Sequence, residues 1–241
     1  MALNPRSQVQ GRTLDRTYTG ELDAGLRAYM LRVYNYMAMG VALTGIVAYA
    51  VALNPQLMQT IALGGFKWVL FAAILGLGWF SGRIIFSASP TMAHGAYWLY
   101  AGLWGALISP MIYAYTGESI ARVFFITAAA FAGTSLYGYT TKRDLSTMGR
   151  FLVMSTIGIL IAVLLNAFFF QSGGFHLILS IVVVLVFAGL TAYETQAIKE
   201  MYAAQDDQEL SSRKAIFGAF TLYGSFVTMF VWMLSIFGNR E

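Results

Sequence analysis

A single carboxylate lies well inside a long apolar run of this chain, and it belongs to Glu194. Placing a charge deep in a lipid bilayer costs about 2.5–3.5 kcal/mol on insertion scales, so such a residue normally faces protein or water and has a function. Lys199 follows five residues later, about 7 Å farther along a helix. A carboxylate that extends to the nearby membrane surface is therefore the competing interpretation.

Arg83 is a candidate partner for Glu194, because both residues are expected near the same end of their predicted helices. An ion pair between them would hold the second and sixth apolar segments together, and protonating Glu194 would weaken it. The alternative for Arg83 is an ordinary anchor at the cytoplasmic membrane surface.

Other chemistry is poorly represented in the sequence. The chain has no cysteine, which excludes disulfides and thiolate ligands. His94 and His176 stand at the starts of predicted helices on opposite sides of the membrane, so they cannot share a metal ion. Phosphate-binding loops, zinc-protease motifs, serine nucleophile elbows and dinucleotide fingerprints are all missing. We therefore expect no catalytic residue, no cofactor and no enzymatic activity.

The composition indicates a membrane protein. Of 241 residues, 58% are hydrophobic and 11% are charged, with a mean hydropathy of +0.65, whereas soluble domains carry about 25% charged residues. The apolar runs are about 20 residues long and continuous, which favours membrane helices over barrel strands. The net charge of +4 is then read as a signal of topology and not of nucleic-acid binding.

Seven helices are predicted, which makes the protein all-α and polytopic. Polar breaks that contain proline or glycine separate several of them, such as residues 54–56, 87–90 and 171–174. Pro110 is expected to kink the third helix. Pairs of small residues, Gly78 with Gly82 and Gly102 with Ala106, could let helices approach closely. The predicted spans are 29–53, 66–86, 93–114, 120–140, 149–170, 175–197 and 215–237, and together residues 29–241 form the transmembrane domain.

The distribution of basic residues predicts the orientation. With the N-terminus in the cytoplasm, the inner loops carry 12 Lys and Arg and the outer loops carry 3, in agreement with the positive-inside rule. Residues 1–28 are polar and lack the apolar core of a signal peptide, so they are expected to form a cytoplasmic, partly flexible tail. Seven crossings would place the C-terminus outside, while a re-entrant segment would return it inside.

Three segments resemble the Bax inhibitor-1 family, also called the transmembrane Bax inhibitor motif family, in its bacterial form. They are residues 121–145 (ARVFFITAAAFAGTSLYGYTTKRDL), 186–200 (VFAGLTAYETQAIKE) and 222–226 (LYGSF). The resemblance implies a seven-helix bundle whose last helix is central, in the bacterial inner membrane. It also implies a pH-sensitive calcium leak, gated by two aspartates on the sixth and seventh helices, with an arginine on the second helix as an alternative partner.

Carried over to this sequence, the resemblance places Glu194 at the sixth-helix aspartate and Arg83 at the arginine. Ser225 replaces the second acid, because this chain reads LYGSF where the family commonly reads Leu-Tyr-Leu-Asp-Phe. Two carboxylates that share a site raise the pKa of one of them, and a lone Glu beside a hydroxyl lacks that coupling. We therefore expect altered pH gating and, at most, a transient calcium contact at Glu194.

Two functions of different classes follow from these observations. The first is a calcium or cation leak channel with Glu194, Arg83 and Ser225 at its gate. The second is a non-conducting modulator of membrane-protein quality control or stress responses, since the resemblance implies association of some bacterial relatives with a membrane-bound AAA protease that could grasp the N-terminal tail. The serine at position 225, in place of an acid, favours the modulator over the channel to some extent. A transporter would need a polar midplane site or an internal repeat, and neither is evident.

Overall fold

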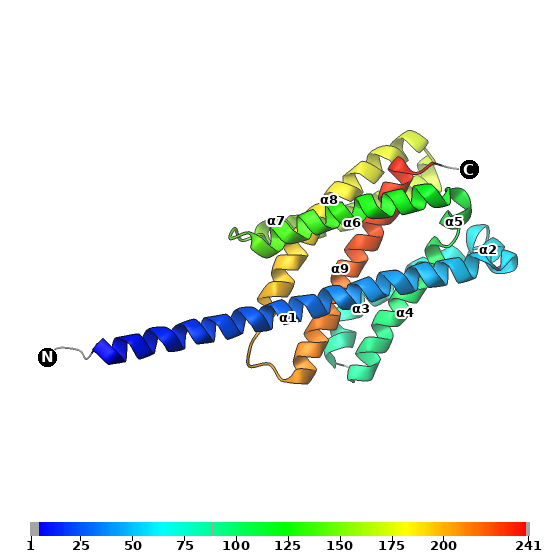
Figure 1. Ribbon diagram of the computed structural model, residues 1–241. Helices are drawn as coiled ribbons and strands as arrows, with labels where there is room; N and C mark the ends of the chain where they lie inside the picture. Colours follow the sequence, from blue (N-terminus) through cyan, green and yellow to red (C-terminus); the bar gives the residue numbers. More distant parts are fainter. Residues whose placement is uncertain (1–4, 88, 240–241) are drawn as a thin grey trace.

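The computed structural model describes residues 5–87 and 89–239, with side chains from residue 24 onward. Within these ranges every regular element is helical, so the predicted all-α class is confirmed (Figure 1). The elements are α1 (Pro5–Ala52), α2 (Pro55–Ala62), α3 (Phe66–Ser87), α4 (Pro90–Ile108), α5 (Met111–Ala114), α6 (Gly117–Thr140), α7 (Ser146–Leu165), the π-helix η1 (Asn166–Phe170), α8 (Gly173–Glu200) and α9 (Gln208–Phe237).

Six helical segments of the described chain are long and apolar enough to cross a membrane, whereas the sequence predicts seven. They are Ala24–Ala52 of α1, α3, α6, α7 with η1, α8 and α9. The predicted third span, 93–114, is not among these six segments, for two reasons. Its tyrosines, tryptophans and His94 bring the mean hydropathy of α4 below that of the six candidate segments. Pro110 also has no N–H to donate, and the segment divides there into α4 and the short α5.

Short polar side chains begin most of the later helices, and three of them, Asn54, Ser89 and Ser172, lie at the predicted breaks. Asn54 accepts hydrogen bonds from the backbone N–H groups of Gln56 and Leu57, and Pro55 occupies the first turn of α2. Ser89, Thr116, Ser172 and Asp207 cap α4, α6, α8 and α9 in the same way. Each cap satisfies a backbone donor that the first helical turn leaves free. The sequence therefore encodes these helix starts locally.

The first helix begins earlier than the sequence predicts. Its backbone is helical from Pro5 and continues without a break to Ala52, so most of the segment expected to be a partly flexible tail is helix. In Figure 1 this N-terminal part of α1 projects beyond the other helices. A helix interior tolerates the polar and charged residues found there, and the next proline after Pro5 is Pro55. Residues 1–4 of the predicted tail lie outside the described chain.

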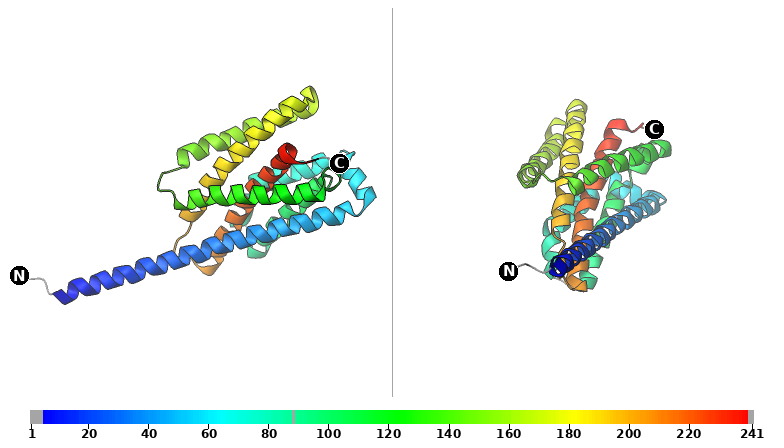
Figure 2. Two further views of the ribbon diagram at one scale, coloured as in Figure 1. Left: turned by 45° about the horizontal axis from the view of Figure 1, so that its top comes forward. Right: turned by 60° about the vertical axis from the view of Figure 1, so that its left-hand side comes forward.

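The last helix, α9, lies in the middle of the bundle. It packs against α1, α3, α4, α6 and α8, and half of its most apolar stretch is buried, the largest share among the six candidate spans. Figure 2 shows α9 between α8 on one side and α1 with α4 on the other. In contrast, α7 packs on α8 at the edge of the bundle, and no residue of its most apolar stretch is buried.

Alternate loops meet at opposite ends of the bundle. At one end, here called the basic end, the α3–α4, α6–α7 and α8–α9 loops come together. Arg213 of α9 donates there to the carbonyl oxygens of Ile85 and Phe86, and Lys199 of α8 donates to that of Tyr139 in α6. At the opposite end, Tyr113 donates to the carbonyl oxygen of Ala52, and the Thr116 N–H donates to that of Asn239.

Candidate functional site

Glu194 of α8 and Ser225 of α9 form a direct contact between the two helices. The Ser225 hydroxyl donates to Oε2 of Glu194 over 2.6 Å. Ser225 is buried, and Glu194 is half-buried between the helices. A hydrogen bond to a carboxylate is stronger than one between neutral groups. The carboxylate inside the apolar layer therefore faces protein, as the argument from its burial cost predicts.

Tyr100 of α4 adds a third polar group near this pair. Its hydroxyl oxygen lies against Gly224, the neighbour of Ser225, where an added Cβ would be 3.2 Å from it. The Tyr100 ring stacks on Phe220 of α9, with 4.1 Å between centroids. Sequence reasoning missed Tyr100, because a tyrosine in an apolar helix has no signal that distinguishes a site residue from a packing residue.

The opposite face of α9 is held by another buried hydrogen bond. The hydroxyls of Tyr223 and Thr44 are 2.5 Å apart, and the Thr44 hydroxyl also lies 3.0 Å from the carbonyl oxygen of Ala101 in α4. Residues two apart on a helix point about 200° away from each other. Two sides of α9 are therefore hydrogen-bonded to neighbouring helices. Tyr223 bonds to Thr44 of α1, which also bonds to α4, and Ser225 bonds to α8.

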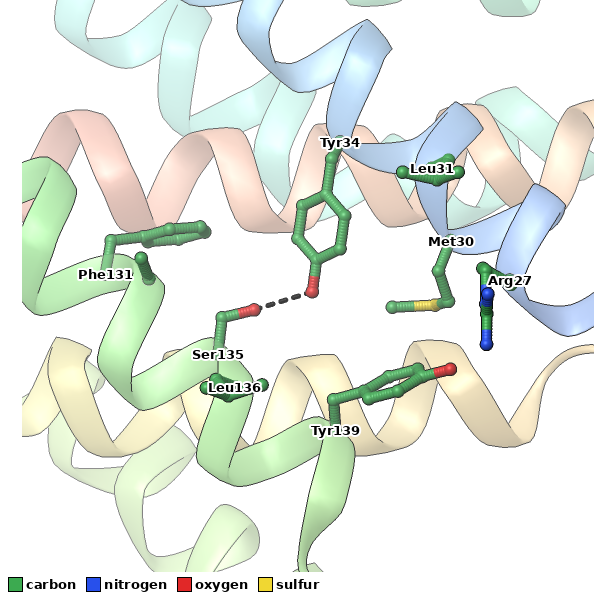
Figure 3. A pocket seen from close by; sticks show the side chains of 9 residues that line it. Arg27, Met30, Leu31, Tyr34, Phe131, Ser135, Leu136 and Tyr139 are labelled. Carbon is green, nitrogen blue, oxygen red and sulfur yellow. Dashed lines mark hydrogen bonds between the residues drawn. The ribbon is translucent and has the colours of Figure 1, made fainter.

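A chain of hydroxyls connects the neighbour of Glu194 to the first helix. Thr195 is hydrogen-bonded to Ser135 of α6 over 3.0 Å, and Ser135 to Tyr34 of α1 over 2.7 Å (Figure 3). Thr195 and Ser135 are buried, and the hydroxyl of each has a hydrogen-bond partner among these three residues. Three helices are thus joined by polar side chains one residue away from the Glu194–Ser225 contact.

The position of α8 is set by close packing at the basic end. The side chain of Gln196 accepts from the Leu145 N–H over 2.8 Å and donates to the Arg143 carbonyl oxygen over 2.9 Å, so it clamps the α6–α7 loop. Asp144 lies between Arg143 and Leu145 in this loop. Hydrogen bonds from the hydroxyl and the backbone N–H of Ser146 hold the pKa of Asp144 below its usual range. Gly138 of α6 lies directly against the backbone of Ala192, where any side chain would collide.

The structure does not bring Arg83 to Glu194. The Arg83 side chain is exposed on α3, and the ion pairs of the described residues join Arg213 to Glu209 and Lys214 to Asp206. Because α9 lies between α3 and α8, the helix that carries Arg83 has no close contact with Glu194. The cation that reaches the end of α3 is instead Arg213, which caps its last carbonyl groups.

No cluster of three or more His, Asp or Glu side chains that could hold a metal ion occurs in the part of the chain described with side chains. Glu194 therefore offers one carboxylate, next to the Ser225 hydroxyl. Calcium usually takes six to eight oxygen ligands. One carboxylate and one hydroxyl supply fewer oxygen ligands than a fixed calcium site of this kind needs.

Comparison with known proteins finds relatives along almost the whole chain. The sequence model described as "Inhibitor of apoptosis-promoting Bax1" matches residues 26–241. An uncharacterized protein of Rickettsia prowazekii is 39% identical, with 91% of this chain and 92% of that protein covered. The inner membrane protein YbhL of Escherichia coli is 40% identical, with 90% and 94% covered. An uncharacterized protein of Deinococcus radiodurans is 33% identical, with 98% and 96% covered.

Proposed function

Because the chain belongs to the Bax inhibitor-1 family of membrane proteins, we propose that it is a cation leak channel in which Glu194 lines the path and α9 is the gate. The observation that carries the proposal is the Glu194–Ser225 hydrogen bond between α8 and the central helix α9. A carboxylate in the apolar layer attracts cations, and its contact with a movable helix provides a means of closing the path.

The proposed membrane arrangement has seven crossings, with the N-terminus in the cytoplasm and the protein in the bacterial inner membrane. Alternate loops lie at opposite ends of the bundle, which supports a crossing by α4 with α5 as well. Lys142 and Arg143 of the α6–α7 loop lie at the basic end together with Lys199, Arg213 and Lys214, which flank the α8–α9 loop. The positive-inside rule, which counts Lys and Arg, assigns such an end to the cytoplasm. The inner membrane location is that of the Escherichia coli relative YbhL.

In this proposal the structure represents a closed state. To open a path beside Glu194, α9 must shift away from α8, which breaks the Ser225 hydrogen bond while the Tyr223–Thr44 bond holds its other face. Calcium is the proposed cation, in transient contact with one carboxylate. Gating by pH is expected to differ from that of a paired-acid site, because Ser225 has no charge to couple with Glu194. Arg83 stays outside this gate.

Calcium flux into proteoliposomes tests the proposal. Glu194→Gln removes the charge and keeps the shape of the side chain, and we expect the flux to fall by at least tenfold. Glu200→Gln is the matched control, since Glu200 lies on the same helix but is exposed at its end, and its flux should equal that of the wild type. A wild-type flux equal to that of empty liposomes would overturn the channel proposal.

Ser225→Asp tests the explanation of pH gating in the same assay. Two carboxylates would then face each other across the α8–α9 contact, and like charges at this distance keep one of them protonated near neutral pH. We expect the variant to show a flux that changes steeply across neutral pH, while the wild-type flux changes less. Equal pH profiles for the two proteins would contradict this explanation.

The modulator remains the alternative if none of these proteins conducts. It would act by protein–protein interaction, with a membrane-bound AAA protease as the partner that the sequence resemblance suggests. Removing residues 1–23, which precede the first candidate span, should then abolish co-purification with such a protease and leave the membrane domain folded. If the shortened chain still co-purifies with the protease, the N-terminal segment is not the part of the protein that the protease binds.

A further inference from the structure

A groove of about 480 Å³ runs between α1 and α6 at the basic end of the bundle (Figure 3). Of the residues described with side chains, nine line it, four from α1 and five from α6. The two helices are not closely packed against each other, so their side chains leave this space open. Its volume lies in the range of roughly 300–1,000 Å³ that is typical of ligand sites.

The lining is apolar along its length and basic at one end. Met30, Leu31, Phe131 and Leu136 form the walls, and Arg27 lies at one end, on the same side of the groove as the Tyr139 ring in Figure 3. Among the lining residues that the structure describes with side chains there is no carboxylate. The hydroxyls of Tyr34 and Ser135 bond to each other, so the floor presents satisfied polar groups. An amphiphile with a hydrocarbon chain and an anionic head matches this pattern.

The position of the groove restricts the source of its occupant. Both helices are candidate membrane spans, Ala24–Ala52 and Gly117–Thr140. Tyr139 stands in the last turn of α6, just before the basic residues Lys142 and Arg143, so the end of the groove that holds Arg27 and Tyr139 lies at the basic end of the bundle. A gap that opens toward hydrocarbon is filled by lipid, and basic pockets between helices on the cytoplasmic side bind anionic head groups.

We propose that the groove binds one anionic phospholipid of the cytoplasmic leaflet. One acyl chain lies against Phe131 and Leu136, and the phosphate contacts Arg27. The lipid fills the space that α1 and α6 leave between them, which would fix the distance between these helices and, through Ser135, support the hydroxyl chain to Thr195. This proposal does not depend on whether the protein conducts ions.

Photo-crosslinking in lipid vesicles tests the acyl-chain contact. The purified protein is reconstituted in phosphatidylcholine with a trace of phosphatidylglycerol that carries a diazirine in one acyl chain, and labelled peptides are mapped by mass spectrometry. We expect label within the groove on α1 and α6. Ala132→Phe should fill the groove and lower this label at least fivefold. Ala129→Phe is the control, because Ala129 is an exposed residue of α6 outside the lining.

The role of Arg27 is tested by comparing head groups. Arg27→Gln should lower labelling by the phosphatidylglycerol probe about fivefold and leave that by a phosphatidylcholine probe unchanged. Arg32→Gln is the matched control on the same helix, since Arg32 is exposed and does not line the groove. Label distributed over other helices, equal labelling by the two head groups, or an equal loss with Arg32→Gln would overturn the proposal.

Discussion

At the scale of single residues, Glu194 depends on a partner from a neighbouring helix. Its carboxylate accepts a hydrogen bond from Ser225, and the Tyr100 hydroxyl lies against Gly224, the neighbour of Ser225. A buried acceptor that loses its donor costs about 1–3 kcal/mol. In membrane proteins hydrogen bonds between helices are worth less on average, about 0.6 kcal/mol. Ser225 therefore contributes a modest but specific share of the contact between α8 and α9.

Ser225→Ala is expected to make α9 easier to displace. Loss of the hydrogen bond lowers the free energy of opening by about 0.6–1.5 kcal/mol, so we expect the calcium flux in proteoliposomes to rise about three- to tenfold. Ser235→Ala is the control, because Ser235 bonds only to a carbonyl group of its own helix. An unchanged or reduced flux in Ser225→Ala would show that this hydrogen bond does not restrain the gate.

At the scale of helices, close approaches of backbone decide how α8 is seated. Gly138 of α6 touches the backbone of Ala192, and Gly149 of α7 lies against the ring of Tyr193. The small-residue pairs that the sequence suggests make no such approach to backbone. An added Cβ would be 3.9 Å from Tyr100 at Gly78 and 3.6 Å from Phe217 at Gly82, and it would find open space at Gly102. Spacing along one helix does not reveal which face meets a neighbour.

Gly138→Ala is therefore expected to destabilise the protein. The added methyl group would collide with the backbone of Ala192, and the helices must separate to accept it, which costs about 1–3 kcal/mol. The free energy of unfolding in mixed micelles measures this loss. Gly133→Ala on the same helix is the control, since open space surrounds that position, and its effect should stay within about 0.5 kcal/mol. Equal effects would contradict the proposed contact.

At the scale of the whole molecule, the loops are sorted between two ends. The α3–α4, α6–α7 and α8–α9 loops share the basic end, where Arg213 and Lys199 bind carbonyl groups of neighbouring helices. The opposite end joins the start of α6 to the chain near Asn239. Lys67 and Arg122 are the basic residues near that end within the described chain. This separation of charge is what the positive-inside rule uses to orient a protein.

The absence of native cysteine makes the orientation directly measurable. We expect Gln205→Cys, in the exposed α8–α9 loop, to react with a membrane-impermeant maleimide only from the cytoplasmic side. Gln56→Cys, at an exposed position of α2, should react only from the other side. Intact and inverted membrane vesicles separate the two cases. Labelling of both positions from the same side would rule out the proposed arrangement of crossings.

The sequence by itself determined the membrane class, the all-α fold, the helix starts at the three polar breaks and the unusual position of Glu194. These properties depend on local composition, on caps such as Asn54 and Ser172, and on the cost of burying one carboxylate. The resemblance to the family implies an acid at the position of Ser225, and the contact between Ser225 and Glu194 was visible only in the structure.

Only the tertiary structure decided which residues meet. Arg83 was a reasonable partner for Glu194 from depth alone, but α9 lies between their helices, and Arg213 occupies the end of α3 instead. Tyr100, the Tyr223–Thr44 bond and the groove beside Arg27 depend equally on which helices are neighbours. Hydropathy determines where a helix crosses the membrane. Its neighbours depend on side-chain packing summed over the whole bundle, which no single segment encodes.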